Sequence, residues 1–341
     1  MIVFGFALTE HCNLRCPHCI RDDVTTVRSL PAELVLRVVD DARALLGPII
    51  ASFTGGEPLL HPEFDSLIDQ LAARGVPWRM VSNGWHMRRI MPLVDRAPPQ
   101  YIRLSLSGAT RETHDHDRGR GSFDRVLLGL GLLTSRQIPT ALSLVLDRRN
   151  RHELEVAVDL AESLGAMRLH LILPQPVPGS MARDSDLPPE EWLPIRRQVT
   201  ALAMAPGRRT AIQLDYGAPF DGPESPCETF LGQRIYVDAR GQLSTCCQLS
   251  EYGFTPSDVV ADLSRTSFAD ALPIYRARLE ELRIAQAPRE DPGDGLATFP
   301  CLRCARASGK LAWLSRYPGT PWQLAAGASA MPVRDPAPLA T

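Results

Sequence analysis

Lysine is almost absent from this 341-residue chain: Lys310 is the only one, and the other Lys/Arg positions are all arginine. This bias indicates a GC-rich genome rather than a function. The formal net charge is −2, so charge gives no reason to expect nucleic acid or an anionic membrane as a partner. No apolar run reaches the length of a membrane span, and no basic segment of a signal peptide opens the chain. We therefore expect a cytoplasmic protein.

Eight cysteines in such a protein are expected to be metal ligands or free thiols rather than disulfides. Three of them follow the apolar run 2–8 in a C-x3-C-x2-C loop: Cys12, Cys16 and Cys19. A loop this short can turn three thiolates onto one metal centre, and it supplies no fourth. On a cubane 4Fe–4S cluster, three thiolates leave one iron open for chemistry. The alternative is a zinc site completed by His11 or His18.

Strand-like and helix-like stretches alternate along the first half of the chain. Expected strands cover residues 2–8, 49–53, 78–81, 101–106, 141–146 and 167–173. Expected helices cover residues 31–46, with Ser29 as N-cap and Gly47 as stop, then 62–74, a stretch after 84, 123–135 and 152–164. This alternation predicts parallel βαβ units, and the chemistry of barrels built from such units lies at the carboxyl ends of the strands.

A second motif, Gly55-Gly56-Glu57-Pro58, follows the second expected strand. Together with the cysteine loop it resembles the radical S-adenosylmethionine (radical SAM) superfamily. The resemblance implies a partial (β/α)6 TIM-like barrel in which the open iron chelates SAM. There, an electron from the cluster breaks the S–C5′ bond, and a 5′-deoxyadenosyl radical abstracts hydrogen from a C–H bond of the substrate. It also implies an electron donor such as flavodoxin or ferredoxin.

The resemblance suggests which residues contact SAM. His18 takes the position of the ring that lies against the adenine. Gly55, Gly56 and Glu57 are expected to hold the amino group, and Pro58 fixes the exit of the turn. Further candidates are polar residues in or after strands and one arginine: Ser82, Asn83, Ser105, Ser143 and Arg118. Local turns and caps, or a surface ion pair of Arg118 with Asp115 or Asp117, are the alternatives. Ser107 stands where the related S-x-D-G pattern has aspartate.

The other five cysteines lie in the last third of the chain. A hairpin turn around residues 239–241 returns Cys246 towards Cys227, and Cys301 and Cys304 follow an expected helix over 267–283. This C-x13-G-x4-C…C-x2-C arrangement resembles the Twitch domain, a shorter relative of the SPASM domain. The resemblance implies that these four cysteines hold an auxiliary 4Fe–4S cluster, with Cys247 surplus or replacing Cys246. A zinc site of four thiolates is the rival interpretation.

We expect three parts in the chain: a barrel over 1–215, a Twitch-type domain over 216–316 and a disordered tail over 317–341. Between them fall a loop over 173–187, a helix over 190–204, a strand over 211–214 and a closing helix over 305–317. His170 is expected as a satisfied core histidine, or else as a cavity residue. Asp215 and Tyr216 are candidates for the substrate side.

The sequence therefore predicts a radical SAM oxidoreductase or peptide and natural-product maturase. Its substrate is expected to be a peptide or a small polar metabolite, with net oxidation or bond formation as the outcome. The alternative is a non-catalytic zinc or iron–sulfur binding or interaction protein. The open cysteine triad and the Gly-Gly-Glu-Pro motif favour the enzyme.

Overall fold

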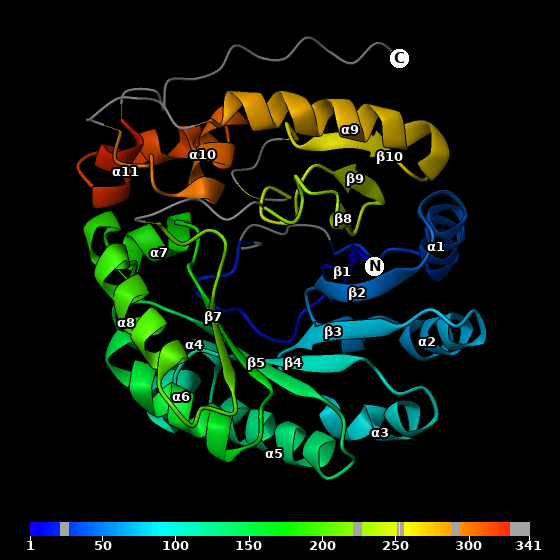
Figure 1. Cartoon of the computed structure of the whole chain (residues 1–341), viewed down its shortest axis with the longest axis horizontal. Helices are drawn as coiled ribbons and strands as arrows, with labels where there is room; N and C mark the ends of the chain where they lie inside the picture. Colours follow the sequence, from blue (N-terminus) through cyan, green and yellow to red (C-terminus); the bar gives the residue numbers. More distant parts are fainter. Residues whose placement is uncertain are drawn as a thin grey trace.

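A computed structural model of the chain describes residues 1–20, 27–183, 185–220, 227–250, 252, 256–287 and 294–327. The described residues form one curved ten-stranded sheet with helices around its outer side (Figure 1). The strand order is β10-β9-β8-β1-β2-β3-β4-β5-β6-β7. The fold is therefore mixed α/β around a mostly parallel sheet, as the alternating sequence pattern predicts.

The six expected strands are confirmed, each parallel to its neighbour along the chain. They are β1 (Ile2–Thr9), β2 (Ile49–Gly55), β3 (Trp78–Ser82), β4 (Tyr101–Leu106), β5 (Thr140–Val145) and β6 (Arg168–Ile172). The expected strand over 211–214 is β7 (Ala211–Leu214), which continues the parallel sheet beside β6. All seven strands thus run the same way and bring their carboxyl ends to one edge.

The helices of the first two thirds of the chain cover the outer face of the sheet (Figure 1). They are α1 (Ala32–Leu46), α2 (Phe64–Ala73), α3 (Met87–Arg96), α4 (Arg111–Arg118), α5 (Ser122–Thr134), α6 (Leu154–Ser163), α7 (Pro178–Arg183) and α8 (Trp192–Met204). Phe64 of α2 packs edge-on against Phe53 of β2 and Trp78 of β3, with ring centroids 6.1 Å apart in both pairs. Because side chains alternate along a strand, the residues between these aromatics point to the inner face.

The last third of the chain adds three strands to the same sheet. These are β8 (Arg234–Val237), β9 (Gln242–Ser244) and β10 (Val259–Asp262). β8 and β9 form the expected hairpin, and β8 also pairs with β1 in parallel through Val3 and Arg234 to Phe6 and Val237. The segment expected as a separate domain therefore shares its sheet with the barrel, and the division near residue 215 stays a prediction.

Several local expectations need correction. Helix α1 begins after Pro31 without a side-chain cap, because Ser29 forms a bridge with Thr9. Helix α4 was not expected at all, and α7 lies in the expected loop 173–187. The helix after Ser267 is α9 (Phe268–Ala285), which runs on through Pro273.

The C-terminal helices also differ from the sequence expectation. The expected closing helix is two pieces, α10 (Pro300–Ala307) and the 3-10 turn η5 (Ala312–Arg316). Within the expected tail, α11 (Pro321–Ala326) is an ordered helix whose Trp322 packs edge-on against Phe299. The rest of that tail, from residue 328, lies outside the described residues. No described helix has the length and apolar character needed to cross a membrane.

The only lysine of the chain anchors the C-terminal segment. Lys310 is fully buried, and its Nζ lies 2.5 Å from Asp258 Oδ1 and donates to the carbonyl of Leu249 at 2.5 Å. Asp258 also accepts from Ser244 at the end of β9. This charge pair therefore links the turn after α10 to the β9–β10 ladder.

We expect Lys310→Met to destabilise the protein by about 3–5 kcal/mol, because it leaves the Asp258 carboxylate buried without its cation. Urea unfolding measures this loss. Arg74→Gln is the control: Arg74 pairs with Asp40 at 3.2 Å on the surface, and its loss should cost less than about 1 kcal/mol. Equal effects of the two substitutions would contradict the anchoring role of Lys310.

Candidate functional site

The C-x3-C-x2-C loop leaves β1 at the carboxyl edge of the sheet. Within it, Leu14 N–H donates to Cys12 Sγ at 3.4 Å and Cys19 N–H donates to the Cys16 carbonyl at 3.1 Å. Burial raises the pKa of Cys16, Arg118 opposes this rise, and Cys19 and Cys12 add to it. The three thiols therefore lie within electrostatic reach of one another, as ligands of one centre must.

The Gly-Gly-Glu-Pro motif lies directly against this loop. Gly56 N–H donates to the Thr9 carbonyl at 2.6 Å, and Glu57 N–H donates to the His11 carbonyl at 2.8 Å. Gly55 has φ +113°, and a Cβ there would lie 2.6 Å from the Thr9 carbonyl oxygen. Only glycine allows this backbone approach, so the motif and the cysteine loop are held together at the ends of β1 and β2.

The Glu57 side chain makes its contacts within the fold, and its expected contact with SAM stays a prediction. Its carboxylate is fully buried and accepts three hydrogen bonds, from Leu59 N–H at 3.3 Å, Ser82 Oγ at 2.9 Å and Asn83 N–H at 2.8 Å. Burial raises the pKa of Glu57 to about 7, although the three hydrogen bonds by themselves lower it. The side chain thus fastens the β2 exit to the β3 exit. Pro58 opens the 3-10 turn η1 (Pro58–Leu60) that follows.

Asn83 connects the end of β3 to the first cysteine. Its Nδ2 donates to Asn13 Oδ1 at 2.9 Å and lies 3.9 Å from Cys12 Sγ, while its Oδ1 accepts from Trp85 N–H at 2.9 Å. The sequence singled out Asn83 but gave no sign of Asn13 as its partner. Asn83 therefore orients the cysteine loop.

The end of helix α4 lies near the cysteine loop: Arg118 and Asp117 are on this helix, and His18 of the loop lies close to Asp117. Arg118 is buried, and its Nε donates to Ser107 Oγ at 2.7 Å, so it is not a surface residue. His18 Nδ1 lies 3.9 Å from Asp117 Oδ2, and Arg149 donates to the other oxygen of that carboxylate at 2.7 Å. The sequence offered Asp117 only as a partner of Arg118 and missed Arg149, because nothing in their spacing points to the cysteine loop.

Ser105 and Ser143 are paired across β4 and β5, and His170 of β6 is paired with Ser143 in turn. Leu104 of β4 points outward, towards α5. Because side chains alternate along a strand, its neighbour Ser105 points to the inner face, and so do Ser143 and His170 in register with it. His170 Nδ1 is 2.8 Å from Arg103 Nη1, and its Nε2 lies 3.8 Å from Asp215 Oδ1 without a hydrogen bond among the described residues. The expectation of a fully satisfied core histidine is thus wrong.

The four C-terminal cysteines of the expected ligand set line one cavity: Cys227, Cys246, Cys301 and Cys304. Burial raises the pKa of Cys301 well above its ordinary value, and Asp215 adds to the rise. A metal centre would supply the positive charge that thiolates here require. Cys247 does not line the cavity; it packs near Ala7 and Tyr236. The geometry therefore favours Cys246 over Cys247 as ligand.

In the part of the chain that the structure describes, no three His, Cys, Asp or Glu side chains form a group that could hold one metal ion.

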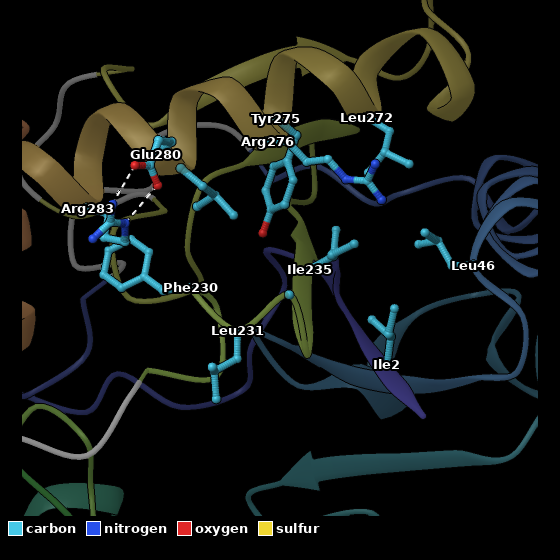
Figure 2. Close-up of a pocket in the computed structure, with 12 residues that line it drawn as sticks. Ile2, Leu46, Phe230, Leu231, Ile235, Leu272, Tyr275, Arg276, Glu280 and Arg283 are labelled. Atoms are coloured by element: carbon cyan, nitrogen blue, oxygen red, sulfur yellow. Dashed lines mark hydrogen bonds and ion pairs between the residues drawn. The ribbon is translucent and has the colours of Figure 1, made fainter.

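Figure 2 shows a larger groove, of about 290 Å³, between α9 and the outer side of β8. Tyr275 reaches from α9 towards Ile235, and Arg283 pairs with Glu280 at its rim. Ile2, the first residue of β1, also lines it, so the groove lies near the amino end of that strand. It contains no cysteine, and it is remote from the carboxyl edge where barrel chemistry takes place.

Residues 6–161 match the family model described as the radical SAM superfamily. This match, over residues 6–161 of the chain, confirms the resemblance that the two motifs carry. The matched range contains the cysteine triad, the Gly-Gly-Glu-Pro motif and Arg118.

Two curated relatives and one solved structure are similar to this chain. AdoMet-dependent heme synthase of Methanosarcina barkeri is 29% identical over 50% of this chain and 49% of its own length. Mycofactocin maturase MftC of Mycobacterium tuberculosis is 33% identical over 48% and 43%. The chain thus spans about half the length of the curated relatives it matches. SuiB of Streptococcus suis, solved with S-adenosylmethionine, superimposes with TM-score 0.70 at 12% identity, covering 94% of this chain and 75% of SuiB, which supports the partial-barrel fold.

We expect the stability contribution of Glu57 to depend on pH. Its folded-state pKa of about 7 lies above the ordinary 4.5. The protonated carboxyl therefore stabilises the fold fully below pH 4.5, and this contribution is lost as pH rises to 7. Between these values wild type should lose roughly 3 kcal/mol relative to Glu57→Gln. Urea unfolding of the full chain at both pH values measures it, with the exposed Glu112→Gln as control. A constant difference between wild type and Glu57→Gln would show that Glu57 titrates normally.

Proposed function

We propose that this protein is a radical SAM enzyme that reductively cleaves S-adenosylmethionine and abstracts hydrogen from a C–H bond of its substrate. The observation that carries the proposal is the open set of three thiols held at the carboxyl edge against the Gly-Gly-Glu-Pro turn. Three thiolates suit a 4Fe–4S cluster whose fourth iron stays open, and the cluster would supply the electron that cleaves SAM.

The remaining residues at this edge would bind SAM or orient the cysteine loop. Asn83 holds the first cysteine, and buried Glu57 fixes the Gly55-Gly56 backbone where the SAM amino group would bind. Arg118 would donate to the SAM carboxylate in a charge-assisted hydrogen bond. His18, held near Asp117, would lie against the adenine. Ser82 supports Glu57, whereas Ser105 and Ser143 face the interior, where the SAM ribose or the substrate would come to lie.

An auxiliary 4Fe–4S cluster on Cys227, Cys246, Cys301 and Cys304 is the second part of the proposal. Four thiolates saturate such a cluster, so it would act through electron transfer or structure. As an acceptor for the electron of a substrate radical, it would give net oxidation or bond formation. The first cluster would take its electron from a donor such as flavodoxin or ferredoxin, in the cytoplasm.

We favour a peptide as substrate. MftC is named a maturase, and SuiB has been solved bound to its precursor peptide SuiA. The alternative is a small-molecule substrate, because another relative is named a heme synthase. Anaerobic reconstitution with SAM and a reductant, followed by assay for 5′-deoxyadenosine, tests the core activity.

Replacing Cys12, Cys16 and Cys19 together with Ala should abolish 5′-deoxyadenosine formation, because no thiolate remains to hold the catalytic cluster. Circular dichroism should show a retained fold, since these side chains lie in a loop outside the strands. Cys247→Ala, which leaves both ligand sets intact, is the matched control. If the triple variant still produced 5′-deoxyadenosine, the assignment of the triad would be wrong.

Replacing Cys301 and Cys304 should lower bound iron and sulfide by about half, as expected for the loss of one of two clusters of equal size. SAM cleavage should persist, because the thiolates proposed as catalytic lie in the loop after β1 and are not changed. Metal analysis of the reconstituted wild type can contradict the proposal of a second iron–sulfur cluster. Iron for one cluster together with stoichiometric zinc would make the C-terminal site a zinc clasp and would remove the proposed electron acceptor.

A further inference from the structure

Four arginines lie on the inner face of the sheet, each on a different strand. They are Arg79 of β3, Arg103 of β4, Arg168 of β6 and Arg234 of β8, here called the inner arginine cluster. Their neighbours along the strands, such as Trp78, Leu104 and Leu169, are buried on the outer face. Strand alternation therefore turns all four guanidinium groups inward.

These groups lie near one another. Burial lowers the pKa of Arg79, and the positive charges of Arg234 and Arg168 lower it further. The pKa of Arg103 is likewise lowered by burial, and by Arg234 and Arg79. Like charges placed close together repel, so the fold has gathered positive charge in its interior at a cost.

Among the described residues, two carboxylates act on the cluster: Glu228 on Arg79 and Arg234, and Asp215 on Arg103. Glu228 pairs with Arg234 at 2.7 Å. Burial lowers the pKa of Arg234, but the Cys247 thiol and Glu228 raise it. The Asp215 carboxylate raises the pKa of Arg103 but lies 3.8 Å from His170 Nε2. In the described part of the chain, these two carboxylates therefore face four guanidinium groups.

Arg103 is the member of the inner arginine cluster that has a buried donor without a hydrogen-bond partner among the described residues. Its Nη1 contacts His170 Nδ1 at 2.8 Å, and its buried Nε has no hydrogen-bond partner among the described residues. Burial, followed by the charge of Arg103, lowers the pKa of His170 to about 3, so this ring is neutral and brings no counter-charge. A buried guanidinium without an anion is costly, and its planar fork matches a carboxylate or a phosphate.

The position of Arg103 suits a substrate group. Ser105, a candidate SAM contact, lies two residues further along β4 on the same face, roughly 7 Å away along the strand. Asp215 connects Arg103 electrostatically to Cys301 of the four-cysteine cavity. The side chains of His170 and Asp215 remain 19% and 11% exposed, so solvent reaches this interior.

We propose that the inner arginine cluster binds an anionic group of the substrate, a carboxylate or a phosphate, and holds the reacting part of the substrate between the two cysteine sets. This inference rests on the proposed function and adds the substrate class: an acidic side chain or carboxyl terminus of a peptide, or a phosphorylated group.

Calorimetric titration of the anaerobically reconstituted full chain tests the anion site. The probes are glutarate, its neutral isostere glutaramide, and inorganic phosphate. Wild type should bind glutarate or phosphate at least tenfold more tightly than glutaramide, and Arg103→Gln should lose at least tenfold of that affinity. Arg103→Lys, which keeps the charge without the fork, should fall between the two. Arg74→Gln on the surface is the control and should match wild type.

Tighter binding of glutarate than of phosphate identifies a carboxylate, and the reverse order identifies a phosphate group. Melting temperature and iron content establish that Arg103→Gln is folded and loaded. If wild type cleaves SAM but binds the anions no better than glutaramide, the anion site is wrong and the proposed function stands. If Arg103→Gln binds the anions as wild type does, the cluster is likewise not the site. Anion binding by a wild type that makes no 5′-deoxyadenosine supports the site and overturns the proposed function.

Discussion

The buried carboxylate of Glu57 is the contact on which the carboxyl edge of the sheet depends. It accepts hydrogen bonds from the turn after β2 and from the end of β3, where Asn83 in turn contacts the cysteine loop after β1. Three consecutive strand ends are thereby fixed by one side chain and its neighbour. A cluster ligand set needs such positioning, because thiols in a loop have no rigid geometry of their own.

The parts of the molecule that depend on local sequence were predictable. Strands β1 to β7 follow from short apolar runs between helical patterns, and the β8–β9 hairpin follows from the turn around Gly241. The Cys12, Cys16 and Cys19 loop and the Gly55 turn were found because their spacing and backbone needs are contained in a few residues. Helix α11 was missed because an alanine- and proline-rich stretch gives no sign of the docking of Trp322.

Contacts between distant residues were not predictable. Nothing in the spacing of Glu57 and Ser82 indicates that the carboxylate of Glu57 accepts hydrogen bonds from the end of the next strand. The arginines of β3, β4, β6 and β8 each look like an isolated polar position in a strand. Only the curvature of the sheet brings them to one interior, where the described residues offer two carboxylates to four guanidinium groups.

The parallel pairing of β8 with β1 has a consequence for how the protein can be divided. Val3 N–H donates to the Gln233 carbonyl at 2.9 Å, and four residues of β1 are in register with β8. Removing the C-terminal third would leave β1 as an open edge with a row of unpaired backbone groups, which is a template for aggregation. The strand that leads into the Cys12, Cys16 and Cys19 loop is therefore covered along this edge by the segment that carries the other five cysteines.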